Sequence, residues 1–175
     1  MNASGCGVMV KDYGYVLRND PAYADKAARV SALTKDLSEL LPDWVAALRP
    51  KLVGDGAASA EKPVLAYHPP CTLQHGQQLR GGVEQHLSQL GFTVAVAQNE
   101  SHLCCGSAGT YSVLNPDLSK QLRDRKLGNL KQVGASSIIS ANVGCISHLQ
   151  SGTDVPVRHW VEVLDAALTK ASVAG

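Results

Sequence analysis

The fold is organised around the stretch Leu103-Cys104-Cys105-Gly106-Ser107-Ala108-Gly109, in which two adjacent cysteines are followed by small residues. Neighbouring side chains in a strand or a helix point in different directions, so two vicinal thiols converge on one object only in a loop. The glycines allow this loop to bend and let its backbone approach whatever the sulfurs hold. We therefore predict a loop that binds a metal or an iron–sulfur cluster.

On both sides of this loop, the residues after position 62 alternate between strand and helix patterns. Strands are expected at 63–67, 92–97, 137–141 and 155–158. Helices are expected at 75–90, from Asn115-Pro116-Asp117 through Val133, and at 160–171. Strand–helix alternation with long crossovers predicts an α/β fold, a parallel sheet flanked by helices.

The cysteines after position 62 each follow one of the expected strands. Cys71 follows the first strand, Cys104 and Cys105 follow the second, and Cys145 follows the third. Open α/β folds bind ligands at the carboxyl edge of the strands, so we expect these cysteines to meet there. Soft thiolates select zinc, copper(I) or iron–sulfur clusters. The spacings match neither the close pairs of zinc ribbons nor the compact ferredoxin run, so both zinc and a cluster stay open.

Composition excludes several classes of function. In these 175 residues, 45% are hydrophobic, but no apolar run approaches the roughly 18 residues of a spanning helix. A net charge of +1 gives no electrostatic case for nucleic acid. Nothing at the start of the sequence resembles a secretory signal, so we expect a cytoplasmic, reducing location. Clustered cysteines are there more often ligands or redox groups than disulfides.

The first 53 residues have a different organisation. Helices are expected at 8–17, 22–30 and 36–48, the last interrupted by Pro42. Residues 2–6 (Asn-Ala-Ser-Gly-Cys) resemble residues 141–145 (Ala-Asn-Val-Gly-Cys), and similar patterns follow both. We interpret residues 1–53 as the end of a first module, 54–62 as a linker and 63–175 as a complete second module. Cys6 then becomes a further candidate metal ligand.

The order Cys71, Cys104-Cys105-Gly106, Cys145 resembles the cysteine-rich "CCG" domain of heterodisulfide reductase subunits and their relatives. The similarity is strongest to the iron–sulfur subunits of bacterial glycolate oxidases and covers essentially the whole chain. It rests on four stretches: Asn2-Ala3-Ser4-Gly5-Cys6-Gly7, His68-Pro69-Pro70-Cys71-Thr72-Leu73-Gln74-His75-Gly76, Leu103-Cys104-Cys105-Gly106-Ser107-Ala108-Gly109-Thr110-Tyr111 and Pro156-Val157-Arg158-His159-Trp160.

The resemblance implies an iron–sulfur electron-transfer subunit of a complex that oxidises glycolate to glyoxylate. Electrons would pass from a flavin subunit through a 4Fe-4S-type cluster toward quinone, at the inner face of the cell membrane. The flavin-containing subunits and a ferredoxin-like N-terminal part of the same subunit are the implied partners. No catalysis is expected from this chain alone. The alternatives are a zinc-binding or metal-free docking domain and, with less support, a thiol–disulfide enzyme using Cys104 and Cys105.

The sequence departs from this family in two respects. The family pattern often ends in Cys-x-x-Cys, whereas here His148 follows Cys145 at the second cysteine's position. An imidazole one helical turn away can face the same centre, so His148 is a candidate ligand or a residue that supports one. The two ferredoxin-type cysteine runs of the family are absent. We expect His68, ahead of two prolines and Cys71, to have a structural role.

Overall fold

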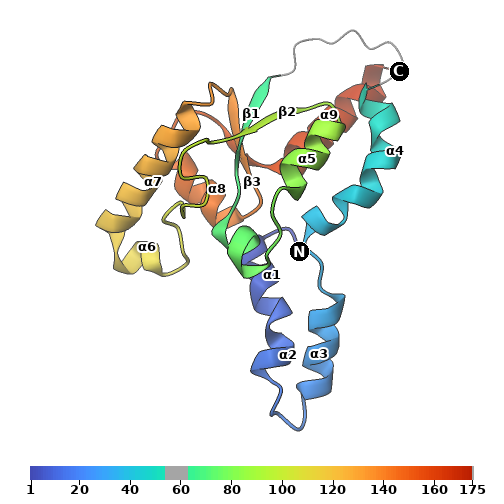
Figure 1. The fold of residues 1–175 in the computed structure, drawn as a ribbon, viewed down its shortest axis with the longest axis vertical. Helices are drawn as coiled ribbons and strands as arrows, with labels where there is room; N and C mark the ends of the chain where they lie inside the picture. The colour runs from blue at the N-terminus through green and yellow to red at the C-terminus, as the bar shows by residue number, and fades with distance from the viewer. Residues whose placement is uncertain (54–62, 175) are drawn as a thin grey trace.

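The computed structural model describes residues 1–53 and 63–174. Its centre is a sheet of four parallel strands: β1 (Val64–His68), β2 (Thr93–Val96), β3 (Ser137–Ser140) and β4 (Val157–His159). The strand order is β2-β1-β3-β4, so β1 lies inside the sheet, with Tyr67 paired to Val96 on one side and to Ile139 on the other. The predicted α/β class is confirmed (Figure 1).

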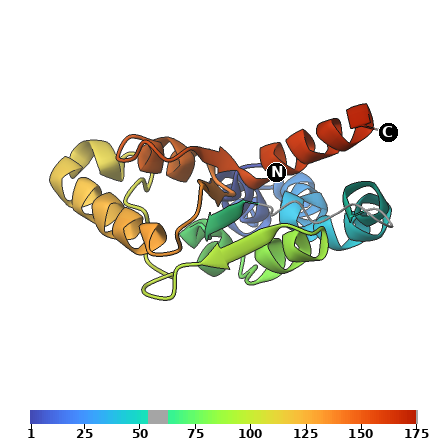
Figure 2. The same ribbon diagram turned by 90° about the horizontal axis from the view of Figure 1, so that it is seen from above.

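Alternating strand residues divide the core into two layers. Leu65, Tyr67 and Ile139 are buried in one layer, and Ala66 and Ile138 are buried in the other. This alternation follows from the two-residue period of a strand. Helices therefore cover both faces of the sheet (Figures 1 and 2).

The first layer is closed by α4 (Leu41–Val53), α5 (Gly82–Gln89) and α9 (Trp160–Ala174). The second is closed by α7 (Pro116–Lys131) and α8 (Val143–Gln150), with the short α6 (Tyr111–Leu114) just before α7. Leu41 is fully buried in the first layer beside residues of β1 and α9, so the N-terminal part shares a core with the sheet.

The N-terminal helices are α1 (Ser4–Lys11), α2 (Tyr13–Val16) and α3 (Ala24–Leu33), of which α2 and α3 project from the body of the molecule (Figure 1). Gly14 allows the two to pack closely, because a Cβ there would lie 3.1 Å from the backbone of Ala28. The Gly14 amide donates to Ser31 Oγ at 2.9 Å. A short turn, Leu37–Glu39, is closed by a capping box between Asp36 and Glu39 and leads into α4.

Several element boundaries differ from the expected ones. The helix expected at 75–90 begins only at Gly82, because Thr72–Gly76 forms a single turn of π-helix and the left-handed residues Gln78 and Gly81 interrupt the chain. Pro42 does not break α4 but occupies its first turn, where proline is tolerated. The predicted linker at 54–62 lies outside the described residues, and the division into two modules stays a prediction.

Candidate metal centre

Three loops at the carboxyl edge of the sheet carry the four cysteines. Cys71 follows β1 after two prolines, Cys104 and Cys105 lie between β2 and α6, and Cys145 is the third residue of α8 just after β3. Parallel strands end at the same edge, which brings together residues that are far apart in the sequence.

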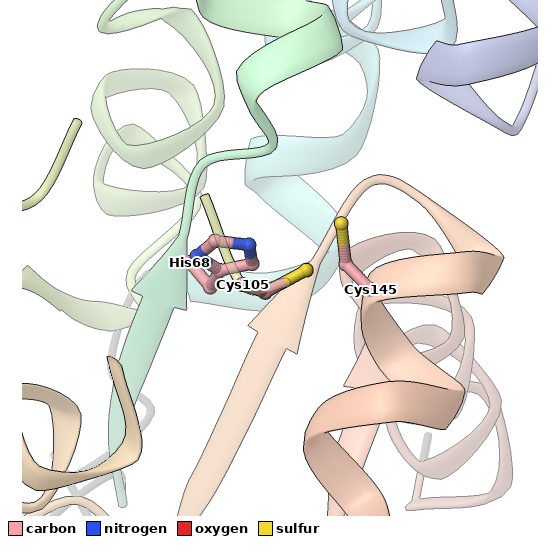
Figure 3. Close-up of side chains that lie close together, drawn as sticks. All are labelled: His68, Cys105 and Cys145. Carbon is pink, nitrogen blue, oxygen red and sulfur yellow. The ribbon is translucent and has the colours of Figure 1, made fainter. Parts of the chain in front are cut away.

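The sulfurs form a connected group. Cys71 Sγ lies 3.9 Å from Cys104 Sγ. The sulfurs of Cys105 and Cys145 and a ring nitrogen of His68 all lie within 4.8 Å of one another, and these three residues are buried. Figure 3 shows His68 at the end of β1, with Cys105 and Cys145 beside it. Cys71 and Cys104 are half-buried, so the group extends from the interior toward the surface.

His68, for which a structural role is expected, lies among the cysteines. It is 0% exposed, and neither ring nitrogen makes a hydrogen bond of acceptable geometry within the described residues. A buried polar atom without a partner is costly, which suggests that a ligand completes it. The place of His68 in the sequence already indicated this position, because His68 comes at the end of a strand whose carboxyl edge also carries the cysteines.

The pKa values of the four cysteine thiols are shifted in opposite directions. Hydrogen bonds from Cys105 and Cys71 lower the pKa of Cys104 to about 2. A hydrogen bond from Cys105, assisted by His68 and Asn142, lowers the pKa of Cys145 to about 5 despite its burial. The pKa values of Cys71 and Cys105 are raised, each mainly by its hydrogen bond to Cys104. The four sulfurs thus form a chain of mutual hydrogen bonds, and such a set of sulfur donors is suited to a soft metal or cluster.

The backbone of the Cys104–Cys105 loop is fixed by Gly106. Its φ is +92°, a left-handed conformation that favours glycine, and its amide donates to Cys104 Sγ at 3.3 Å. A Cβ at this position would lie 2.3 Å from the carbonyl oxygen of Ser119. Ser119 Oγ in turn donates to the Gly106 carbonyl at 2.8 Å. The loop therefore packs closely against α7.

The imidazole of His148 contacts Ser119 of α7 and does not lie among the sulfurs in the part of the chain that the structure describes. Its Nε2 lies 3.1 Å from Ser119 Oγ and 3.3 Å from the Ser119 carbonyl oxygen. Through Ser119 it supports Gly106 and hence the cysteine loop. His148 therefore contacts the cysteine loop through Ser119, whereas His68 lies among the cysteines.

Cys6 is exposed on α1 and does not belong to the group of ligands found within residues 1–53 and 63–174. The two similar sequence segments are nevertheless neighbours in space. The Ser4 amide donates to the Ala141 carbonyl at 3.0 Å, and the Gly5 amide donates to Asn142 Oδ1 at 3.2 Å. Cys6 as a metal ligand stays a prediction.

This geometry defines a cysteine-rich α/β domain whose buried cysteines and histidine could hold a soft metal. The family described as "Cysteine-rich domain" (CCG) matches residues 65–150. The chain is 49% identical over 96% of its length to the glycolate oxidase iron-sulfur subunit of Escherichia coli, and it spans 39% of that subunit. It is 32% identical to lactate utilization protein A of Geobacillus thermodenitrificans, over 93% of this chain and 67% of that protein. The chain belongs to the CCG cysteine-rich domain family, and the resemblance to glycolate oxidase iron–sulfur subunits is confirmed.

A probable glycolate oxidase iron-sulfur subunit of Bacillus subtilis is 26% identical over 87% of the chain, which spans 33% of that protein. Family and donor set together support a metal or iron–sulfur cofactor. None of the described helices has the length and apolar character needed to cross a membrane.

Proposed function

We propose that this chain is an electron-transfer module of a glycolate-oxidising complex, with a 4Fe-4S-type cluster bound at the sheet edge. The cluster would relay electrons from a flavin subunit toward quinone. The observation that carries the proposal is the convergence of four thiols from three strand-end loops with the buried imidazole at the end of β1. The proposed ligands are Cys71, Cys104, Cys105, Cys145 and His68.

The chain's own residues prepare this site for an anionic group. The amides of Gly106 and Ser107 donate to the sulfurs of Cys104 and Cys105, and Asn142 Nδ2 lies 3.5 Å from Cys145 Sγ. Hydrogen bonds to sulfur stabilise thiolates and raise cluster potentials. Cys105 and Cys145 are buried, which excludes water from one side of the centre.

A zinc-binding or metal-free docking domain is the second candidate. The close grouping of His68, Cys105 and Cys145 within 4.8 Å favours it, because three such ligands with one more sulfur satisfy tetrahedral zinc.

Metal analysis after anaerobic purification separates the two candidates. We expect a brown protein with about four irons per chain, whereas the zinc alternative requires a colourless protein with about one zinc. Cys145→Ser should lose most of the iron, because it removes a buried thiolate. Cys6→Ser, which removes an exposed thiol outside the group, tests the remaining candidate ligand: an unchanged iron content excludes Cys6 from the site, and a loss of iron includes it. A colourless wild-type protein without iron contradicts the proposal.

The projecting N-terminal helices are the proposed docking surface for the ferredoxin-like part of the same subunit. Tyr15 on α2 is 70% exposed and Leu33 on α3 is 72% exposed. Val16 on α2, Tyr23 just before α3 and Met9 on the preceding α1 are exposed as well. Exposed apolar groups clustered in this way mark interaction sites. We place the assembled complex in the cytoplasm, at the inner face of the cell membrane.

Binding of a separately produced ferredoxin-like part, measured by calorimetry, tests this surface. Exchanging Tyr15 and Leu33 together for serine should weaken binding by at least about tenfold, because two apolar contacts are lost. Val173→Ser is the control, since Val173 is 84% exposed on α9, far from the projecting helices. Equal affinities for both variants and the wild type contradict the assignment.

A further inference from the structure

A second cavity lies beside the cysteine centre, at the carboxyl edge of β1 and β2. It has a volume of about 310 Å³ and is enclosed by the end of β1, the end of β2 and the start of α5. Its walls include Pro69 and Ser101, which belong to the loops that carry Cys71 and Cys104. A cavity of this volume is large enough for a small polar molecule.

One wall of the cavity is the N-terminus of α5. Gly82, Val83 and Glu84 form the first turn of this helix and line the cavity. Among the residues that the structure describes, their amides have no hydrogen-bond acceptor, and no side chain caps the helix. Free N–H groups at the positive end of a helix dipole favour a bound anion.

A buried hydroxyl group without a partner lines the same cavity. Tyr67 is 1% exposed, and its Oη makes no hydrogen bond within residues 1–53 and 63–174. Burial, followed by the charges of Glu84 and Asp36, raises the pKa of Tyr67 well above its usual range, so the hydroxyl keeps its proton and can donate it. Glu84 is the acid with the largest influence, which places this hydroxyl at the α5 end of the cavity. An unpaired buried donor is costly, and it points to a ligand atom that accepts from it.

Two charged side chains line the cavity closer to solvent. The exposed guanidinium of Arg80 donates from Nε to the Gln74 carbonyl at 3.1 Å, and no carboxylate of the described residues forms an ion pair with it. Glu84 carries the opposite charge and has no ion-pair partner there either. Asp36 is already hydrogen-bonded within its own capping box. Arg80 therefore favours an anion in the cavity, and Glu84 weakens its binding.

We propose that this cavity binds a small organic anion, whose carboxylate or phosphate group accepts hydrogen bonds from the free amides of α5 and from Tyr67, with Arg80 at the rim. Both groups are oxyanions with several acceptor positions, as this set of donors requires. The site needs no metal, so it goes beyond the proposed function and does not depend on it.

Titration of the chain with acetate and, separately, with inorganic phosphate at constant ionic strength tests the site. The amide NMR signals of Gly82 and Val83 should shift saturably, whereas those of Asp117 and Leu118, in the first turn of α7 and outside this cavity, should not. The anion with the higher affinity identifies the headgroup class. A lack of saturable shifts at α5 with both anions, or equal shifts at both helices, overturns the proposal.

Tyr67→Phe separates the buried hydroxyl from the overall charge of the protein. It changes no charge, and it should weaken anion binding about tenfold, because a hydrogen bond to a charged group is lost. The urea midpoint of this variant should not fall, since the hydroxyl has no partner in the described chain. Tyr111→Phe is the control, because Tyr111 is half-buried outside the cavity. Equal affinities of Tyr67→Phe and the wild type overturn the proposal.

Substitutions of the two charged residues should have opposite effects. Arg80→Gln should weaken anion binding about threefold and Glu84→Gln should strengthen it about threefold, as expected for charges near solvent. Arg158→Gln removes the same charge from an exposed position on β4 outside the cavity and should leave the affinity unchanged. Equal effects of Arg158→Gln and Arg80→Gln overturn the role of Arg80. If the wild type binds the anion at α5 but contains no iron, this site stands and the iron–sulfur function fails.

Discussion

Gly106→Ala is expected to abolish stable metal binding and to lower the free energy of unfolding by about 2 to 4 kcal/mol, the sum of left-handed backbone strain and steric overpacking. The new Cβ would lie 2.3 Å from the Ser119 carbonyl oxygen, which is backbone and cannot move aside as a side chain can. Relief requires the loop to leave α7, and the Cys104 and Cys105 sulfurs would move with it. Urea unfolding and iron analysis measure the two effects.

Gly128→Ala is the matched control for this substitution. Gly128 lies on the same helix that carries Ser119, but a Cβ there meets no atom within 4 Å. Alanine has a higher helix propensity than glycine, so we expect a stabilisation of up to about 1 kcal/mol and an unchanged iron content. Wild-type stability and iron content in Gly106→Ala would show that the loop is not held as described.

His68→Phe is expected to lose bound metal while keeping the metal-free protein intact. Phenylalanine retains a ring of similar size but removes two buried nitrogens that make no well-directed hydrogen bond, although the imidazole lies close enough to Cys145 to lower the pKa of that thiol. Metal affinity should fall by more than the roughly 10- to 100-fold typical of residues outside the ligand set. The unfolding free energy of the metal-free protein should stay the same or rise by about 1 kcal/mol, because an unsatisfied polar group is removed.

His148→Phe provides the comparison. It breaks the contact between Nε2 and Ser119, which supports Gly106 from a distance. We expect a loss of about 1 kcal/mol in stability and a metal content close to that of the wild type. Loss of metal in His148→Phe together with full retention in His68→Phe would reverse the assignment of the two histidines. Metal analysis and urea unfolding of both variants, measured side by side, decide between them.

The helix boundaries show where sequence patterns were insufficient. The start of α5 at Gly82, not at position 75, depends on the chain at 72–81, where the Leu79 amide donates to the Leu73 carbonyl and Gly81 takes a left-handed φ. The sequence contains a Gly81–Gly82 pair within the expected helix, and glycine has a low helix propensity. It could not show that a π-helical turn would replace the first part of that helix.

The sequence by itself determined the α/β class and the edge at which the cysteines meet. Apolar periodicity and strand–helix alternation follow from local backbone geometry, and parallel strands with crossovers end on one side. The cysteine order Cys71, Cys104-Cys105-Gly106, Cys145 was enough to indicate the family.

Only the tertiary structure decided which histidine lies among the sulfurs. Helical spacing made His148 a candidate, but α8 packs beside α7 and brings that imidazole onto Ser119. The strand order places β1 between β2 and β3, so His68, its last residue, lies between the loops that carry Cys105 and Cys145. The same packing buries Lys126 beneath the cysteine loop. The reason is physical: strand and helix patterns are local, whereas the partner of a side chain depends on which elements pack against it.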